Sequence, residues 1–261
     1  MRLCIVGYPL GHTLSPVVYN RYFRSLGISA RYGTVEISPE RFETVIGRIL
    51  REYDGFNVTI PFKERILDHV EVQNEARIIR AVNCVFRNQG YNTDWIGFVK
   101  SLEDVDVSEP ILVLGAGGAA RAVLYGLCKM GMKHVILVNR TFNRAARLAE
   151  SFRKLGLPLE VYDLSKLRQL LPRVKSLINT TSVGLKGDIF SIEPHDLSHL
   201  HLVYDVVYGE TPLQQRAKGV GVVHVIGGEE MLRLQAVENL RIWGLLEDEE
   251  VFKRVFEEVT R

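Results

Sequence analysis

The residues best suited to chemistry lie in a glycine-rich segment near the middle of the chain. Residues 111–120 read ILVLGAGGAA, so Gly115 and Gly117 follow a short apolar run and Ala120 comes three residues later. Between a strand and a helix, the first glycine permits a tight turn and the second lets the backbone approach a pyrophosphate. A small third residue allows the helix to pack closely on the strand, and the free N–H groups of its first turn face the phosphates. The spacing therefore predicts a dinucleotide-binding turn.

A second polar segment indicates which dinucleotide is bound. Asn139, Arg140 and Thr141 follow the next predicted strand, and Arg144 comes one turn later. NAD-binding proteins usually carry an acidic residue at this point, and an acid would repel a 2′-phosphate. Two guanidinium groups instead donate charged hydrogen bonds to a phosphate. The segment therefore favours NADP, although a solvated basic start of a helix would have the same composition.

Strand and helix patterns alternate from end to end, which predicts an α/β fold with mostly parallel sheets. An early helix is expected to start at Ser15-Pro16, because serine is a preferred N-cap and proline suits the first turn. Another helix is expected to begin near Lys63. The acidic segment 103–110, closed by a proline, is the expected domain boundary. We therefore predict domains over residues 1–102 and 103–227, with a helical tail over 228–261.

Composition excludes several classes of protein. The chain has 261 residues with 33 basic and 31 acidic side chains, so its net charge of +2 creates no broad basic field for nucleic acid. Its 3 cysteines are far apart and form no CxxC pair, which argues against a disulfide framework or a cysteine-based zinc site. No apolar run approaches the roughly 18 residues that span a bilayer, and no signal segment is evident. These features predict a cytoplasmic protein without a metal, nucleic-acid or membrane partner.

Further polar residues fall where sites of α/β proteins form, at strand ends and helix starts. They are Thr13, Ser15, Asn57, Thr59, Lys63, Asn83, Asn92, Thr93, Asp94 and Gln235. Two competing patterns are weaker. Ser182 lacks the preceding glycine of a hydrolase nucleophile elbow, and His195, His199 and His201 have no matching set of metal ligands.

Taken together, these segments resemble the shikimate dehydrogenase family. The matching segments run in order along essentially the whole chain: GYPLGHTLSP (7–16), NVTIPFK (57–63), AVN (81–83), NTD (92–94), GAGGAARA (115–122), NRT (139–141), NTTSVG (179–184), DVVYGETPL (205–213) and GGEEMLRLQA (227–236). The resemblance implies an N-terminal α/β substrate domain, a Rossmann-type NADP domain, and C-terminal helices that return to the first domain. It also implies reversible NADPH-dependent reduction of 3-dehydroshikimate to shikimate, a step towards chorismate and the aromatic amino acids.

The resemblance also assigns roles to individual positions. Lys63 and Asp94 match the catalytic pair, in which the ammonium protonates or stabilises the developing alkoxide and the carboxylate orients the ammonium. We expect the start of the helix near Lys63 to disfavour the ammonium and Asp94 to favour it. Thr13 and Ser15 match the pair of hydroxyls that binds the substrate carboxylate. The remaining matches to substrate ligands are Asn57, Thr59, Asn83, Tyr208 and Gln235. The matches to cofactor-binding positions are Gly115, Ala116, Gly117, Gly118, Ala119, Asn139, Arg140, Thr141, Arg144, Thr181, Ser182, Val206 and Gly228.

Some positions depart from the family pattern and leave alternatives open. Thr13 replaces the commoner serine, and Arg80, Cys84 and Trp95 stand where smaller residues are usual. A relative that oxidises quinate as well as shikimate, or that uses NAD, is one alternative, and a non-catalytic sensor of shikimate-like acids is another. The presence of both Lys63 and Asp94 argues against the sensor. The chain is expected to be a monomer or a homodimer.

Overall fold

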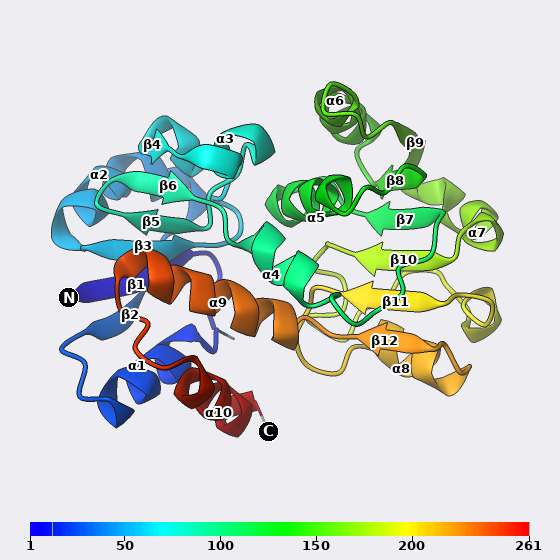
Figure 1. Ribbon diagram of the computed structural model, residues 1–261. Coiled ribbons are helices and arrows are strands. Elements are labelled where there is room, and N and C mark those ends of the chain that lie inside the picture. Colours follow the sequence, from blue (N-terminus) through cyan, green and yellow to red (C-terminus); the bar gives the residue numbers. More distant parts are fainter. Residues whose placement is uncertain (12, 261) are drawn as a thin grey trace. The chain divides into compact units, whose positions relative to one another are not determined.

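The computed structural model describes residues 1–11 and 13–260, so His12, within the 7–16 segment, lies outside the described residues. The chain forms two compact units (Figure 1). Unit 1 comprises residues 1–93 and the tail from Gln235, and unit 2 comprises Asp94–Leu234.

The boundary between the units differs from the predicted one after residue 102. It precedes helix α4 (Asp94–Lys100), which packs on α5 (Gly118–Lys129). The contact is close, because a Cβ built at Gly126 would lie 2.7 Å from Cδ1 of Phe98. Helix α4 therefore belongs to the second unit, and the acidic segment 103–110 lies inside that unit.

Unit 1 is built on a six-stranded mixed sheet with the strand order β2-β1-β3-β5-β6-β4. Its strands are β1 (Arg2–Gly7), β2 (Arg31–Glu36), β3 (Gly55–Val58), β4 (Glu71–Val72), β5 (Cys84–Phe86) and β6 (Gln89–Tyr91). Strands β1, β2 and β3 are parallel, whereas β5 runs antiparallel to β3 and β6 antiparallel to β5. The ends of β1, β3 and β6 and the start of β5 therefore lie at one edge of the sheet, and the adjoining segments contain most of the predicted substrate residues.

Helices of unit 1 come from both ends of the chain. They are α1 (Ser15–Ser25), α2 (Phe42–Glu52), α3 (Asn74–Ile79), the second half of α9 (Glu229–Trp243), and α10 (Glu249–Thr260). Helix α1 buries its apolar face as the spacing predicts, and α10 lies beside it (Figure 1). Arg21 of α1 pairs with Glu258 of α10 at 2.5 Å, and the Tyr22 hydroxyl accepts the Glu247 N–H at 2.9 Å. The C-terminal helices therefore return to the first unit, as predicted.

Unit 2 contains a parallel six-stranded sheet with the order β12-β11-β10-β7-β8-β9 (Figure 1). Its strands are β7 (Ile111–Leu114), β8 (Val135–Asn139), β9 (Leu159–Asp163), β10 (Ser176–Asn179), β11 (Leu202–Asp205) and β12 (His224–Ile226). Counted from β7, this is the 3-2-1-4-5-6 order of dinucleotide-binding folds. Both central strands, β7 and β10, are buried along their whole length, as expected for a sheet covered on both faces. The predicted Rossmann-type architecture is confirmed.

Helices of unit 2 precede, connect and follow its parallel strands. Besides α4 and α5 they are α6 (Phe142–Arg153), α7 (Leu167–Leu170), α8 (Pro212–Gly219) and the first half of α9. Helix α8 has a complete N-terminal signal, because Pro212 is its first residue and the Thr211 hydroxyl accepts the Gln214 N–H at 3.2 Å.

Two local predictions are wrong. Lys63 does not begin a helix: it lies in a turn before a short 3₁₀ helix, Arg65–Asp68, and its carbonyl accepts the Val82 N–H at 2.8 Å. The helix that forms near Lys63 is thus a single 3₁₀ turn that starts two residues later, instead of the expected helix. Ser15 is the first residue of α1 rather than its N-cap. The cap is Leu14, whose carbonyl accepts the first helical hydrogen bonds.

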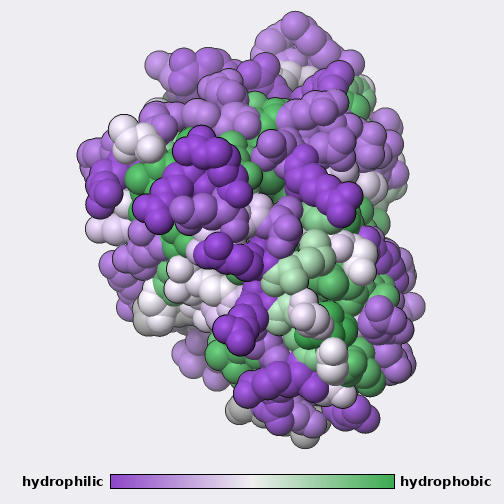
Figure 2. Space-filling model, turned by 90° about the vertical axis from the view of Figure 1, so that its left-hand side faces the viewer, coloured by the Kyte–Doolittle hydropathy of each residue, from purple (hydrophilic) through white to green (hydrophobic). Residues whose placement is uncertain are grey.

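No helix in the described parts of the chain has the length and apolar character needed to cross a membrane. On the face shown in Figure 2, hydrophilic residues cover much of the surface and hydrophobic residues lie between them. Two of the exposed large apolar side chains, Tyr8 and Ile60, follow β1 and β3, and the Tyr8 N–H donates to the Ile60 carbonyl at 2.9 Å.

Candidate active site

A buried hydrogen-bond network connects predicted substrate residues at the edge of the unit 1 sheet. Asn83 Nδ2 donates to Thr93 Oγ1 at 2.9 Å and to Gln235 Oε1 at 3.2 Å, while the Thr93 N–H donates to Asn83 Oδ1 at 2.7 Å. Asn57 Nδ2 donates to the Asn83 carbonyl at 3.0 Å. All four residues are buried. The fold thus brings together Asn57, Asn83 and Gln235 from three distant parts of the sequence.

Tyr32 extends this network to the start of α1. Its hydroxyl donates to Asn57 Oδ1 at 2.6 Å, and the Ser15 side chain lies near it. The ring is buried and stacks on Tyr19 with centroids 4.5 Å apart. Burial raises the pKa of the Tyr32 hydroxyl well above its ordinary value, so the group remains a hydrogen-bond donor at neutral pH. The Tyr32 phenol is therefore a neighbour of Ser15 and a hydrogen-bond donor to Asn57.

Sequence reasoning missed Tyr32 and Asn239 and assigned no role to Thr93. The Thr93 hydroxyl donates to Asn239 Oδ1 at 2.8 Å, and Asn239 Nδ2 donates to Gln235 Oε1 at 2.9 Å and to the Tyr19 hydroxyl at 3.1 Å. A signal for Asn239 was present, because it follows Gln235 by four residues and so lies on the same face of α9. Thr93 stands inside the NTD segment, where only Asp94 was assigned a function.

Thr93→Val should destabilise the protein by about 2 kcal/mol, because the isosteric change removes the hydroxyl that binds Asn83 Nδ2 and Asn239 Oδ1 in a site where Thr93 is 1% exposed. The melting temperature should fall by several degrees. Thr44→Val is the matched control, since the exposed Thr44 hydroxyl donates to the Arg41 carbonyl on the surface, and a change of less than about 0.5 kcal/mol is expected there. Urea denaturation of both variants checks the prediction, and equal losses would contradict it.

Thr13, Thr59 and Lys63 lie half-buried in the segments that follow β1 and β3. The two segments approach closely, since a Cβ built at Gly7 would lie 2.4 Å from Cγ2 of Thr59. Glycine at the end of β1 is therefore required by this contact. Asp94 is buried at the first position of α4. Its pairing with Lys63 stays a prediction.

The glycine-rich turn of unit 2 has the geometry that its sequence predicts. Gly115 adopts a φ of +107°, and a Cβ there would lie 2.6 Å from Thr180 Oγ1. Gly117 precedes the first residue of α5, Gly118, in an extended conformation. A Cβ at Gly117 would meet one atom within 4 Å, Nη2 of Arg144, at 3.9 Å. The backbone at Gly117 is thus open on the side where the helix N–H groups begin.

Arg144 lies against this turn. Its Nε donates to the Ala116 carbonyl at 2.9 Å, which places a guanidinium charge beside the amino end of α5. Arg140 and Thr141 are exposed in the loop before α6, and Asn139 Nδ2 closes that loop by donating to the Thr141 carbonyl at 2.9 Å. An open glycine backbone, a helix start and a nearby guanidinium form a set of groups that fits the phosphates of NADP.

The other predicted cofactor residues lie in loops after β10 and β11 and before α9. Thr181 Oγ1 donates to Asn179 Oδ1 at 2.8 Å, and Ser182 follows in the same half-buried to exposed loop. Val206 and Gly228 are in direct contact, because a Cβ at Gly228 would lie 2.2 Å from the Val206 carbonyl oxygen. Tyr208 is half-buried, and this burial raises the pKa of its hydroxyl. These loops adjoin the carboxyl edge of the parallel sheet, where α/β proteins bind ligands.

Comparison with known proteins agrees with this geometry. Residues 5–85 match the model of the shikimate dehydrogenase substrate binding domain, and residues 100–186 match that of shikimate / quinate 5-dehydrogenase. A shikimate dehydrogenase of Thermotoga petrophila is 54% identical over 261 residues, 100% of both chains. The crystal structure of shikimate dehydrogenase from Thermotoga maritima has a TM-score of 0.93 at 52% identity and covers 100% of both chains. A Thermus thermophilus shikimate 5-dehydrogenase in complex with NADP(H) and shikimate has a TM-score of 0.82 at 32% identity, over 99% of each chain.

The chain belongs to the shikimate dehydrogenase family. The curated relative from Thermotoga maritima, 52% identical over 261 residues and 100% of both chains, is a shikimate dehydrogenase (NADP(+)). The predictions of family, fold class, enzyme class and NADP dependence are confirmed.

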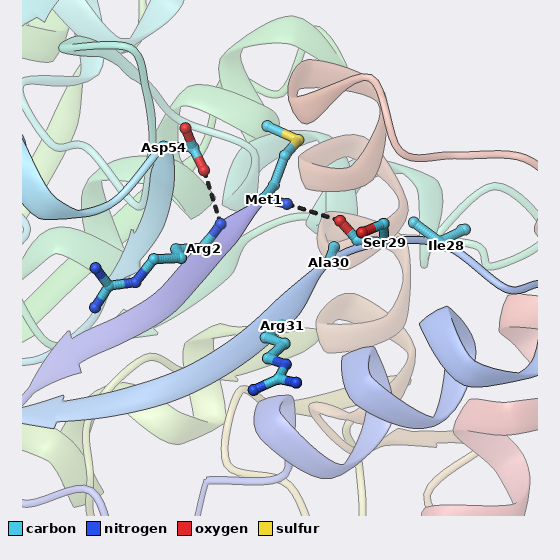
Figure 3. Close-up of a pocket in the computed structure, with 7 residues that line it drawn as sticks. All are labelled: Met1, Arg2, Ile28, Ser29, Ala30, Arg31 and Asp54. Carbon is cyan, nitrogen blue, oxygen red and sulfur yellow. Dashed lines mark hydrogen bonds between the residues drawn. The ribbon is translucent and has the colours of Figure 1, made fainter.

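A surface pocket of unit 1 lies away from the residues that match the family's ligands. It is formed at the amino ends of β1 and β2, where the Met1 ammonium donates to the Ser29 carbonyl at 2.7 Å and the Arg2 N–H donates to Asp54 Oδ2 at 2.7 Å (Figure 3). The predicted substrate residues follow the carboxyl ends of β1 and β3. This pocket is therefore separate from the candidate active site.

Proposed function

We propose that the chain catalyses the reversible reduction of 3-dehydroshikimate by NADPH, with Lys63 and Asp94 as its catalytic residues. The observation that carries the proposal is the buried amide and hydroxyl network around Asn57, Asn83 and Gln235. A small acid with several hydroxyl groups is recognised by neutral donors and acceptors held in fixed directions. The Thermus thermophilus relative was solved with NADP(H) and shikimate, which supports the same pair of ligands for this chain.

The substrate carboxylate is proposed to bind at Thr13 and Ser15. Both side chains are half-buried hydroxyls near the amino end of α1, and the positive end of that helix favours an anion. Asn57, Thr59, Asn83 and Gln235 then bind the ring hydroxyls, with Tyr208 as a further contact.

The cofactor is proposed to bind along unit 2. Gly117 and the N–H groups at the start of α5 receive the pyrophosphate, while Arg140, Thr141 and Arg144 bind the 2′-phosphate. The remaining family matches, Gly115, Ala116, Gly118, Ala119, Asn139, Thr181, Ser182, Val206 and Gly228, complete the proposed cofactor site.

The proposed chemistry needs one hydride and one proton for each ketone reduced. Bound NADPH supplies the hydride to the ketone carbon. Lys63 gives its proton to the oxygen as that atom gains negative charge, and it takes the proton back when shikimate is oxidised. Asp94 orients the Lys63 ammonium and accepts a hydrogen bond from a substrate hydroxyl.

An absorbance assay at the nicotinamide band, with shikimate, quinate, NADP⁺ and NAD⁺ crossed, tests this function. We expect turnover with shikimate and NADP⁺ well above every other pair. Equal turnover of quinate with NAD⁺ would indicate the broader quinate/shikimate dehydrogenase. Binding of shikimate without turnover would indicate a sensor and contradict the proposal.

Ser15→Ala should raise KM for shikimate by about 5–10-fold and leave KM for NADP⁺ unchanged, because it removes one hydroxyl donor to the carboxylate. Since Ser15 does not cap α1, the free energy of unfolding should change by less than about 1 kcal/mol. Ser25→Ala, at the other end of α1, removes a hydroxyl that donates to the Tyr22 carbonyl at 2.9 Å and serves as the control. Steady-state kinetics would disprove the role of Ser15 if both variants kept the normal KM.

We also propose that the protein works in the cytoplasm as a monomer or a homodimer. Its ligands are small water-soluble acids and nucleotides. The cysteines, Cys4, Cys84 and Cys128, are all free thiols, as is usual in a reducing compartment.

A further inference from the structure

Asp205 is a buried carboxylate with no role in the predicted site. It ends β11 and is 0% exposed. Its Oδ1 accepts hydrogen bonds from Asn179 Nδ2 at 2.9 Å and from the Val207 N–H at 3.1 Å, and its Oδ2 accepts one from the Thr211 hydroxyl at 2.7 Å. Burial of a carboxylate is costly, and desolvation raises the pKa of Asp205 despite these three hydrogen bonds. Because burying this carboxylate is unfavourable, its presence in the core of unit 2 requires an explanation.

One partner of Asp205 determines the shape of the loop after β10. Asn179 donates to Asp205 through Nδ2 and accepts through Oδ1 from the N–H and the hydroxyl of Thr181, at 3.0 and 2.8 Å. Thr181 Oγ1 in turn accepts the Val183 N–H at 3.1 Å. The direction of the Asn179 amide is set by the carboxylate, because only its NH₂ group can face Asp205.

The other partners determine the loop after β11. The Val207 N–H and the Thr211 hydroxyl bind opposite oxygens of Asp205, so the chain between them is tied at both ends. The backbone at Val206 is pressed against Gly228, and the Gly228 N–H donates to the Val207 carbonyl at 3.2 Å. One carboxylate thus connects the segments that contain Thr181, Val206 and Gly228.

We propose that Asp205 is a positioning residue that holds these three segments in the arrangement that receives the nicotinamide half of the cofactor. The inference rests on the proposed NADP site. It assigns no contact between Asp205 and the cofactor: the carboxylate acts through Asn179, Val207 and Thr211. The phosphates are proposed to bind at the glycine turn and at Arg144, whose Nε donates to the Ala116 carbonyl, and these groups should remain intact without Asp205.

Two ligands distinguish the nicotinamide side of the proposed cofactor site from its phosphate side. NADP⁺ carries a nicotinamide ring on its second ribose, whereas 2′-phospho-ADP-ribose has the same adenosine, 2′-phosphate, pyrophosphate and second ribose but no nicotinamide. In Asp205→Asn, an NH₂ group replaces one acceptor oxygen. It then faces groups that donate hydrogen bonds to that oxygen in the wild type, so those bonds cannot form. Calorimetry should show NADP⁺ binding about 10-fold more weakly to this variant, with 2′-phospho-ADP-ribose within about twofold of wild type.

Variants of Thr211 provide a second test that leaves the carboxylate in place. Thr211→Val removes the hydroxyl at constant shape and should weaken NADP⁺ selectively by about 3- to 10-fold, whereas Thr211→Ser keeps the hydroxyl and should bind normally. Ser176→Ala is the stability control. Its side chain is buried at the opposite end of β10, where the hydroxyl donates to the Ser108 carbonyl at 2.6 Å, so its loss should lower the melting temperature and leave both affinities unchanged.

The inference and the proposed NADP site fail in different ways. Wild-type protein that binds neither ligand would contradict the site. The positioning role would be overturned if the wild-type protein bound both ligands and Asp205→Asn weakened the two affinities equally. It would also be overturned if Asp205→Asn changed neither affinity. If Asp205→Asn does not fold, the same comparison between Thr211→Val and Thr211→Ser decides the question.

Discussion

Lys63→Ala should lower kcat for shikimate oxidation by about 10²–10⁴-fold, with a much smaller change in KM for shikimate. The ammonium interacts most strongly with the substrate oxygen when that atom carries developing charge, so its removal affects the transition state more than the bound ground state. Lys63 is half-buried in a turn that the Val82 N–H holds through the Lys63 carbonyl. Steady-state kinetics in both directions of the reaction measures the effect.

Asp94→Ala should slow turnover and also raise KM for shikimate, since this carboxylate is proposed to contact the substrate. The double variant with Lys63→Ala should lose less than the product of the two single losses, because the two residues are proposed to act as a unit. Lys253→Ala, an exposed lysine on α10, is the control for loss of a charge and should behave as wild type. A Lys63→Ala enzyme with near-normal kcat and intact circular dichroism would exclude the proton-transfer role.

Arg140→Ala should weaken NADP⁺ by about 10-fold or more and leave NAD⁺ nearly unchanged, because a charged hydrogen bond to the 2′-phosphate contributes about 1.5–3 kcal/mol. Combination with Arg144→Ala should bring the loss to about 100-fold. Arg144→Ala alone should also weaken NAD⁺ somewhat, since its Nε supports the Ala116 carbonyl of the glycine turn.

Dissociation constants for both cofactors, measured by calorimetry, test this prediction. Arg147→Ala, one turn further along α6 and exposed, should leave both constants unchanged. Equal losses of NADP⁺ and NAD⁺ affinity in Arg140→Ala would mean that this residue has a structural role instead.

The features that the sequence determined by itself depend on neighbours in the chain. The glycine turn at residues 115–120 needs only a backbone with positive φ at Gly115 and no side chain at Gly117, and both are properties of single residues. The alternation of strands and helices likewise follows from local hydrophobic period, and it was enough to predict an α/β fold with mostly parallel sheets. The Rossmann-type domain was predicted from the resemblance to the family. Matches to the family, such as NVTIPFK and NRT, then identified candidate residues without any knowledge of which groups they contact in the fold.

Only the tertiary structure decided which groups bind one another. Asn83 exchanges hydrogen bonds with Thr93 and donates to Gln235. The Tyr32 hydroxyl donates to Asn57, and no local pattern encodes any of these pairings. The two local errors have the same cause. Near Lys63 only a short 3₁₀ helix, Arg65–Asp68, forms, and the Lys63 carbonyl binds the Val82 N–H of another segment. Helix α1 begins at Ser15 itself, one residue earlier than expected for a helix capped by that side chain. A buried polar group needs a hydrogen-bond partner. Which partner it has depends on how distant segments pack together and not on the propensity of any single residue.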